Sequence, residues 1–328
     1  MDESRRILFL IFSGLFGLVV GSFLNVVIFR LPRNCMSIAG GRSKCPSCRT
    51  LIAWYDNVPV ASWLVLGGTC RTCGVRISPR YALVELLTGL LFLAAGYLQL
   101  WRPTLDAPVE RVTQFVIHAY LISAIVASTF IDIDWEILPD EINRSGLALG
   151  LVAGAGLPAV LFGEVPRTIA WLGWLPDALR PHAWGLVHSG LGAAAGGGSM
   201  YAVNILGKIL FRRKLARLKL DDAMGFGDVK YLAFLGAFLG WQGMGLTFLV
   251  SIFAGALWGV GKGLVTLRFD RALLERPERM GFGSVSWAMG KVPFGPFLSV
   301  GALAVLFAKP WLVRAIQAYL ELFQGPRG

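Results

Sequence analysis

Two aspartate-containing segments have the residue types and positions that suit acid–base chemistry. The first runs from Ile131 to Asp140 and carries Asp132 at the end of a long apolar stretch. The second, Gly225-Phe226-Gly227-Asp228, comes directly before another apolar stretch. A carboxylate close to the apolar core of a membrane is costly, which makes it a candidate functional group. Two such carboxylates brought together share a proton, so that one activates water while the other protonates a carbonyl, which is the chemistry of aspartic proteases.

Simpler roles also fit these acidic residues. Asp228 stands at a predicted helix start, where an acid caps the helix. Asp134, Glu136 and Asp140 suit solvated positions at the membrane interface, with Asp140 a cap or turn residue, and the acidic cluster could instead bind a metal. The chain contains no GxSxG serine elbow, no HExxH zinc motif and no Walker loop. Spacing alone leaves the choice open.

Four of the five cysteines form two CxxC pairs, Cys45 with Cys48 and Cys70 with Cys73. This spacing presents four thiolates to one ion, and a site with four protein ligands is typical of structural zinc. The metal would also hold together a segment too short to bury a large core. Disulfides and free thiols are the alternatives, and Cys35 lies outside the pattern. The three histidines form no metal-hydrolase spacing with carboxylates, so we expect no catalytic zinc.

The elements that must position these groups are membrane helices. With 55% hydrophobic and 16% charged residues, and a mean hydropathy of +0.62, the chain is too apolar for a soluble protein. We expect an all-α polytopic membrane protein with about eight transmembrane helices and a small cytoplasmic zinc-ribbon-like domain between helices 1 and 2. The expected helices are 7–29, 83–101, 112–131, 145–163, 186–211, 229–240, 242–266 and 292–309. The pair on either side of Gly240 is separated only by a glycine-rich break.

The basic residues, which give a net charge of +11, gather in three loops and predict the orientation. Loops 30–82, 212–219 and 268–291 should be cytoplasmic, together with 132–144. Loops 102–111 and 164–185 and both termini should lie outside. The chain then divides into a first transmembrane helix at 1–29, a tetracysteine domain at 30–82 and a transmembrane peptidase domain at 83–328. Because the positive charge is used for orientation, we expect no nucleic-acid partner.

Several short motifs along the chain resemble those of one family, the bacterial type IV prepilin peptidases, which are GxGD-type intramembrane aspartyl proteases. The shared motifs are Gly21-Ser22-Phe23-Leu24-Asn25-Val26-Val27, Arg30-Leu31-Pro32, the double CxxC, Asn57-Val58-Pro59, Arg80-Tyr81, Glu85-Leu86, Asp132 with Leu138-Pro139-Asp140, Gly225 to Lys230, and Pro293-Phe294-Gly295-Pro296. Each motif is weak by itself, but their order along nearly the whole chain is specific.

The resemblance implies that Asp132 and Asp228 are the catalytic pair, with Asp134 as the rival for the first role. It implies removal of a basic leader peptide from prepilins and pseudopilins on the cytoplasmic side of the bacterial inner membrane. Members with the tetracysteine domain usually also methylate the new N-terminal amine with S-adenosylmethionine, for which we expect a site near residues 54–85.

Three alternatives to this bifunctional enzyme remain. The chain could be a peptidase without methyltransferase activity, or a transporter or secretion scaffold that uses the two aspartates as a proton relay. A zinc-ribbon membrane adaptor would explain the cysteines but not the GxGD motif.

Overall fold

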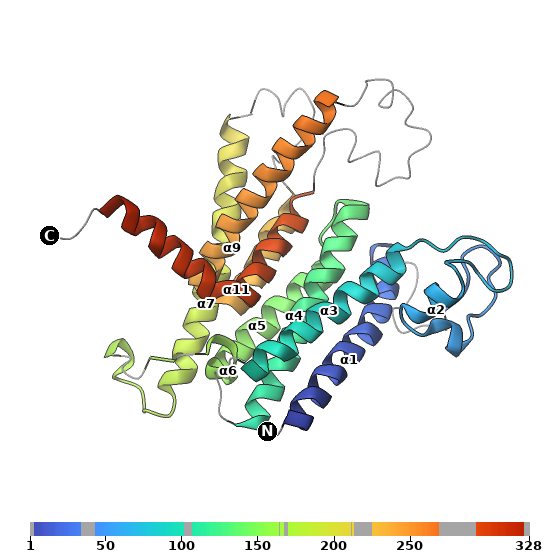
Figure 1. Ribbon diagram of the computed structural model, residues 1–328. Coiled ribbons are helices and arrows are strands. Elements are labelled where there is room, and N and C mark those ends of the chain that lie inside the picture. Colours follow the sequence, from blue (N-terminus) through green and yellow to red (C-terminus); the bar gives the residue numbers. More distant parts are fainter. Residues whose placement is uncertain are drawn as a thin grey trace. The chain divides into compact units, whose positions relative to one another are not determined.

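The computed structural model describes residues 3–33, 43–101, 107–163, 165–166, 170–210, 212, 225–268 and 293–324. These residues are mostly helical and form no strand, as expected from the sequence (Figure 1). The helices are α1 (Glu3–Arg30), α2 (Ala61–Val65), α3 (Arg80–Trp101), α4 (Pro108–Trp135), α5 (Asp140–Gly156), α6 (Pro158–Phe162), α7 (Arg180–Leu210), α9 (Phe226–Arg268) and α11 (Gly295–Gln324).

Within the described residues, five helical segments are long and apolar enough to cross a membrane. They are Glu3–Arg33, Arg80–Leu100, Pro108–Trp135, Phe226–Gly261 and Gly295–Tyr319. The expected helix at 145–163 corresponds to α5 and α6, which are interrupted at Leu157, and the one at 186–211 corresponds to α7. The chain is therefore a multi-pass helical membrane protein, while these helices do not establish the expected total of eight spans. The basic loops 213–219 and 269–291 lie outside the described residues.

The expected break between two helices near Gly240 is confirmed. The span labelled α9 consists of two helical parts joined at a kink, with non-helical backbone angles at Gly240 (φ 69°, ψ 171°). Glycine adopts this positive φ without steric cost, and any side chain here would also collide with the imidazole of His188. In α11, Pro310 lies inside the helix, and the ribbon bends along its length (Figure 1). Proline removes a backbone donor and commonly kinks a helix.

The chain divides into two compact units, Met1–Ile131 and Asp132–Gly328. In the first, α1 packs along α3, and the two ribbons run side by side in Figure 1. Gly17 permits this approach, because a Cβ there would lie 2.6 Å from the Cβ of Phe92. From α4, Phe115 adds edge-on ring contacts to Phe9 and Phe92. The expected domain limits at 29/30 and 82/83 stay predictions.

In the second unit, α9 packs against α5, α7 and α11. Small residues make these contacts close, as is usual where lipid provides no hydrophobic drive between helices. Gly192 of α7 faces the backbone of Gly236 in α9, and Gly150 of α5 faces Ala237. The side chains of Tyr231, Leu232 and others of α9 are completely buried between these helices. The start of α9, where Asp228 lies, is therefore held by neighbours.

Candidate active site and metal centre

Asp132 is a buried carboxylate at the end of α4, with 5% of its surface exposed. The helix stops just beyond it because Glu136 takes a left-handed conformation (φ 54°) while its N–H donates to the Asp132 carbonyl at 2.9 Å. The Asp132 side chain accepts a hydrogen bond from the backbone N–H of Gly295, with 3.1 Å between N and Oδ2. Gly295 is the first residue of α11, so its N–H has no partner within the helix and is free for this contact.

Asp228 lies in the first turn of α9 and is partly buried. It is the third residue of the helix, so it does not occupy the capping position before the first turn. Its own N–H donates to the carbonyl of Gly225 at 3.2 Å. Asp228 is near enough for its charge to act on Asp132, and the catalytic pairing of the two carboxyls stays a prediction.

The rival residue Asp134 is two positions after Asp132 on the same helix. Residues two apart on a helix point in widely different directions. Asp134 is less buried than Asp132, and it has interactions of its own. The geometry therefore favours Asp132 for pairing with Asp228.

Asp140 forms an ion pair that the sequence analysis missed. We expected Asp140 to be a cap or turn residue before a helix at 145–163, but it is the first residue of α5 and Pro139 is the cap. Its carboxylate binds Lys230, with Nζ at 2.6 Å from Oδ1 and 2.8 Å from Oδ2. Arg144 adds a contact at 2.8 Å. The hydrogen bonds from Lys230 are the main reason that the pKa of Asp140 lies below its usual range. Because Lys230 is two residues from Asp228, this pair ties the start of α5 to the start of α9.

The glycine before Asp228 is used for close packing. Gly227 has no positive φ, and a Cβ added there would lie 3.2 Å from the Cβ of Leu138, which is itself buried. Among the described residues, the neighbour that it accommodates is Leu138, which comes from the Leu138-Pro139-Asp140 motif. The two aspartate motifs are thus packed directly on one another.

The sequence analysis also missed a pair of residues in contact, Tyr231 of α9 and Ser299 of α11. The Tyr231 hydroxyl is 2.8 Å from Oγ of Ser299, and Ser299 donates to the carbonyl of Gly295 at 2.9 Å. Tyr231 is one turn after Asp228 on α9, whereas Ser299 is one turn after Gly295 on α11. Tyr231 and Ser299 are 68 positions apart, and their spacing in the sequence did not predict this contact.

The four predicted metal ligands come together in the first unit. The sulfur atoms of Cys45, Cys48, Cys70 and Cys73 all lie within 4.8 Å of one another, and none forms a disulfide. Cys45 and Cys73 have their sulfurs 3.8 Å apart. A tetrahedral ion with metal–sulfur bonds of about 2.3 Å requires sulfurs about 3.8 Å apart, whereas a disulfide requires about 2.05 Å. The group therefore fits a single tetrahedral metal ion.

The two CxxC turns have the same backbone geometry. In the first, the N–H of Cys45 donates to the Thr50 carbonyl at 3.0 Å and the N–H of Arg49 to the Cys45 carbonyl at 2.9 Å. In the second, Cys70 and Gly74 repeat these contacts, each at 2.9 Å. Arg49 and Gly74 both have positive φ, 58° and 67°. The pKa values of the thiols are shifted in both directions: hydrogen bonding with Thr50 is the largest cause that lowers the pKa of Cys48 to about 6, whereas the pKa of Cys73 is raised to about 11.

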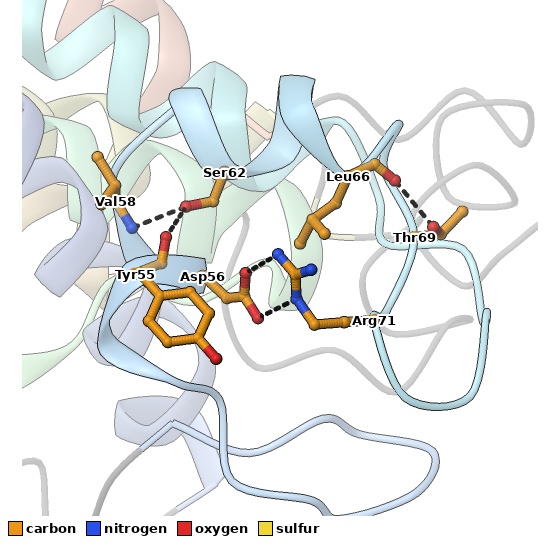
Figure 2. Close-up of polar contacts among 7 residues, drawn as sticks. All are labelled: Tyr55, Asp56, Val58, Ser62, Leu66, Thr69 and Arg71. Atoms are coloured by element: carbon orange, nitrogen blue, oxygen red, sulfur yellow. Dashed lines mark hydrogen bonds and ion pairs between the residues drawn. The ribbon is translucent and has the colours of Figure 1, made fainter.

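Side-chain contacts hold the segment between the two turns (Figure 2). Arg71 donates two hydrogen bonds to Asp56, at 2.8 and 2.6 Å, and Ser62 bridges the Val58 N–H and the Tyr55 carbonyl. The Val60 N–H donates to the Glu85 carboxylate of α3 at 2.7 Å. These contacts join the cysteine domain to the start of α3. Cys35 lies outside the described residues.

Comparison with known proteins agrees with the family resemblance seen in the sequence. Residues 15–99 match the Bacterial Peptidase A24 N-terminal domain, and residues 119–260 match the Type IV leader peptidase family. A Prepilin leader peptidase/N-methyltransferase of Myxococcus xanthus (strain DK1622) is 33% identical over 97% of this chain and 96% of its own. One of Aeromonas salmonicida (strain A449) is 35% identical over 89% of each chain, and one of Stutzerimonas stutzeri is 31% identical over 97% and 96%. No solved structure matches the chain.

Proposed function

Because the chain belongs to the type IV leader peptidase family, we propose that it is a membrane aspartyl endopeptidase for type IV prepilins and pseudopilins. It removes their basic leader peptide on the cytoplasmic side of the bacterial inner membrane and then methylates the new N-terminal amine. The observation that supports the peptidase proposal is the packing of Gly227 against Leu138, which brings the segment of Asp228 against the segment that follows Asp132.

The chemistry follows from two carboxyls that share one proton. The ionised member removes a proton from water, which attacks the scissile carbonyl, and the protonated member donates its proton to the carbonyl oxygen. The buried setting of Asp132 supports this role, since a dry site strengthens the effect of each charge. A basic leader is attracted to the acidic residues in the last turn of α4 and the first turn of α5, while the apolar part of the substrate stays in lipid.

The ion in the cysteine cluster is proposed to be structural zinc. Cys45, Cys48, Cys70 and Cys73 would hold it with no open coordination position, so it stabilises the domain and takes no part in hydrolysis. Its role would be to keep the segment from Lys44 to Arg76 folded, because the only ladder contacts there are two isolated bridges, Lys44 with Leu51 and Thr69 with Arg76.

The second activity needs a methyl donor, S-adenosylmethionine, which supplies the methyl group to the amine. In the expected region, residues 54–85, the two carboxylates already have partners, Asp56 with Arg71 and Glu85 with the Val60 N–H. Neither marks a place for the positively charged donor. We therefore assign no residue to it.

The deciding experiment compares Asp132→Asn and Asp228→Asn with the wild-type enzyme in membranes that contain a prepilin-like substrate. Each change removes the acid–base pair but keeps nearly the same shape, so leader removal should stop while the protein stays in the membrane. Asp134→Asn is the matched control and should retain most of the activity. Inactivation by Asp134→Asn alone would contradict the assignment of Asp132.

Mass spectrometry of the product separates the remaining alternatives. A product one methyl heavier than simple cleavage predicts supports both activities, and a product without the methyl leaves a peptidase alone. Full cleavage by either Asp132→Asn or Asp228→Asn would contradict the proposed chemistry. It would favour the alternative that the two aspartates form a proton relay in a transporter or secretion scaffold.

A further inference from the structure

The buried contact between Tyr231 and Ser299 is a chain of hydrogen bonds that ends at Asp132. Ser299 has one hydroxyl proton, which it donates to the Gly295 carbonyl at 2.9 Å. The contact of 2.8 Å between the two hydroxyls then has Tyr231 as its donor. Gly295 in turn donates its N–H to Asp132. The order is therefore Tyr231 to Ser299, Ser299 to Gly295, and Gly295 to Asp132.

The side chains in this chain of hydrogen bonds are buried. Tyr231 is completely buried, and Ser299 and Asp132 have only 2% and 5% of their surface exposed. A hydroxyl buried in an apolar helix bundle is costly unless it is hydrogen-bonded, so the two hydroxyls hold one another in place. Tyr231 also lies near enough to Asp132 and Asp228 for their charges to act on it.

The chain of bonds matters because the first turn of α11 has few backbone donors that can reach Asp132. Pro296 has no N–H to offer, and the N–H groups of Phe297 and Leu298 both turn back to the Phe294 carbonyl. Gly295 is thus the donor that faces α4, and the direction of its N–H depends on how this single residue is held. Ser299 holds its carbonyl side, while Tyr231 connects Ser299 to the helix that carries Asp228.

We propose that Tyr231 and Ser299 are positioning residues that aim the Gly295 N–H at the Asp132 carboxylate. This inference rests on the proposed peptidase function. Neither hydroxyl is a catalytic group, since the proton of each is already used within the chain. Their effect is to keep the distance and angle of the hydrogen bond from the Gly295 N–H to the Asp132 carboxylate constant during turnover. A catalytic site stabilises its transition state best when its groups are held in place before the reaction.

The test uses Tyr231→Phe and Ser299→Ala in the full-length enzyme, with kcat and KM measured for leader removal. Both changes delete one hydroxyl and leave the remaining side chain in place. We expect kcat to fall about tenfold in each, because one donor is no longer held in position, with KM within about twofold of wild type. The double variant should be no slower than the worse single variant, because both hydroxyls serve one chain.

Ser189→Ala is the matched control. Ser189 is a completely buried serine of α7 in the same unit, and its hydroxyl lies 2.5 Å from the Ala237 carbonyl of α9 and 3.0 Å from the Gly150 carbonyl of α5. Its loss therefore also removes a buried hydrogen bond between helices. It should lower the thermal unfolding midpoint about as much as Ser299→Ala does, yet leave kcat within about twofold.

The outcomes separate the inference from the function on which it rests. Normal kcat in Tyr231→Phe, with no activity in Asp132→Asn, would overturn the positioning role and leave the peptidase intact. Equal losses of kcat in Ser189→Ala and Ser299→Ala would also overturn it, because general destabilisation would then explain both. Absence of cleavage by the wild-type enzyme would instead refute the proposed function. If Ser299→Ala does not accumulate, Tyr231→Phe decides the question alone.

Discussion

Replacing Gly295 by alanine tests the geometry of the proposed active site most directly. A Cβ at this position would overlap Oδ2 of Asp132, and it would also approach the Cγ and Cβ of the same side chain at 3.1 and 3.4 Å. Real Cβ atoms do not make such contacts, so the Asp132 carboxylate or the first turn of α11 must move. Either movement breaks the hydrogen bond from the Gly295 N–H to Asp132.

The size of the effect follows from that displacement. Moving a catalytic group by about 1 Å costs on the order of 10²-fold in rate, and losing one donor to a charged group costs on the order of 10-fold or more. We therefore expect kcat for leader removal to fall about 10²-fold, with little change in KM, because Gly295 touches the catalytic carboxyl and not a bound leader. The helix itself should tolerate alanine at its first residue.

The assay is leader removal from a prepilin-like substrate, followed as initial rates at several substrate concentrations in reconstituted membranes. Gly245→Ala is the control, since a Cβ at this glycine of α9 meets no atom within 4 Å. It should leave kcat unchanged. A Gly295→Ala enzyme with wild-type kcat would refute the arrangement of Asp132 against α11.

Three other predictions, made with four substitutions, test separate parts of the structure. Gly74→Ala should cost about 1 kcal/mol of stability in the cysteine domain, because Gly74 has a positive φ in open space and only the backbone strain changes. Arg49→Gly relieves the same strain and should stabilise the domain by several tenths of a kcal/mol. The resistance of the domain to a metal chelator measures both effects. Lys230 lowers the pKa of Asp140, so the ion pair stabilises the fold at pH values above the unfolded pKa of about 3.9. This stabilisation is lost as the pH falls through the lower pKa of the native state. The small difference in stability between wild type and Asp140→Asn, measured by acid titration of unfolding, should therefore vanish below that native pKa. Gly236→Ala should lower the unfolding midpoint strongly, since its Cβ would meet the backbone of Gly192; an unchanged midpoint in a thermal scan would argue against the close packing of α7 on α9.

The helical elements and the cysteine cluster were predictable because their signals are local. Apolar stretches long enough to cross a membrane form helices wherever they occur, since lipid leaves backbone groups no other partner. The four cysteines announce a metal site by spacing alone, because each CxxC turn presents two sulfurs to the same point. The break at Gly240 was also predictable, because glycine-rich sequence marks the kink between the two helical parts of α9.

The arrangement of charged and polar groups around the aspartates depended on contacts between distant segments. Asp132 and Asp134 are chemically alike in the sequence, and only the burial of Asp132 and its hydrogen bond from the Gly295 N–H distinguish the two. The pairing of Asp140 with Lys230 spans 90 positions and needs α5 and α9 to be side by side.

The amino-acid sequence thus determined which residues could do chemistry, since residue type, hydropathy and short spacings are properties of the chain itself. Tertiary structure decided which of them meet. The N–H of Gly295 and the hydroxyls of Tyr231 and Ser299 acquire their roles only when three helices pack together. A hydrogen bond depends on a distance and an angle between atoms, and for residues far apart in sequence those are set by the fold.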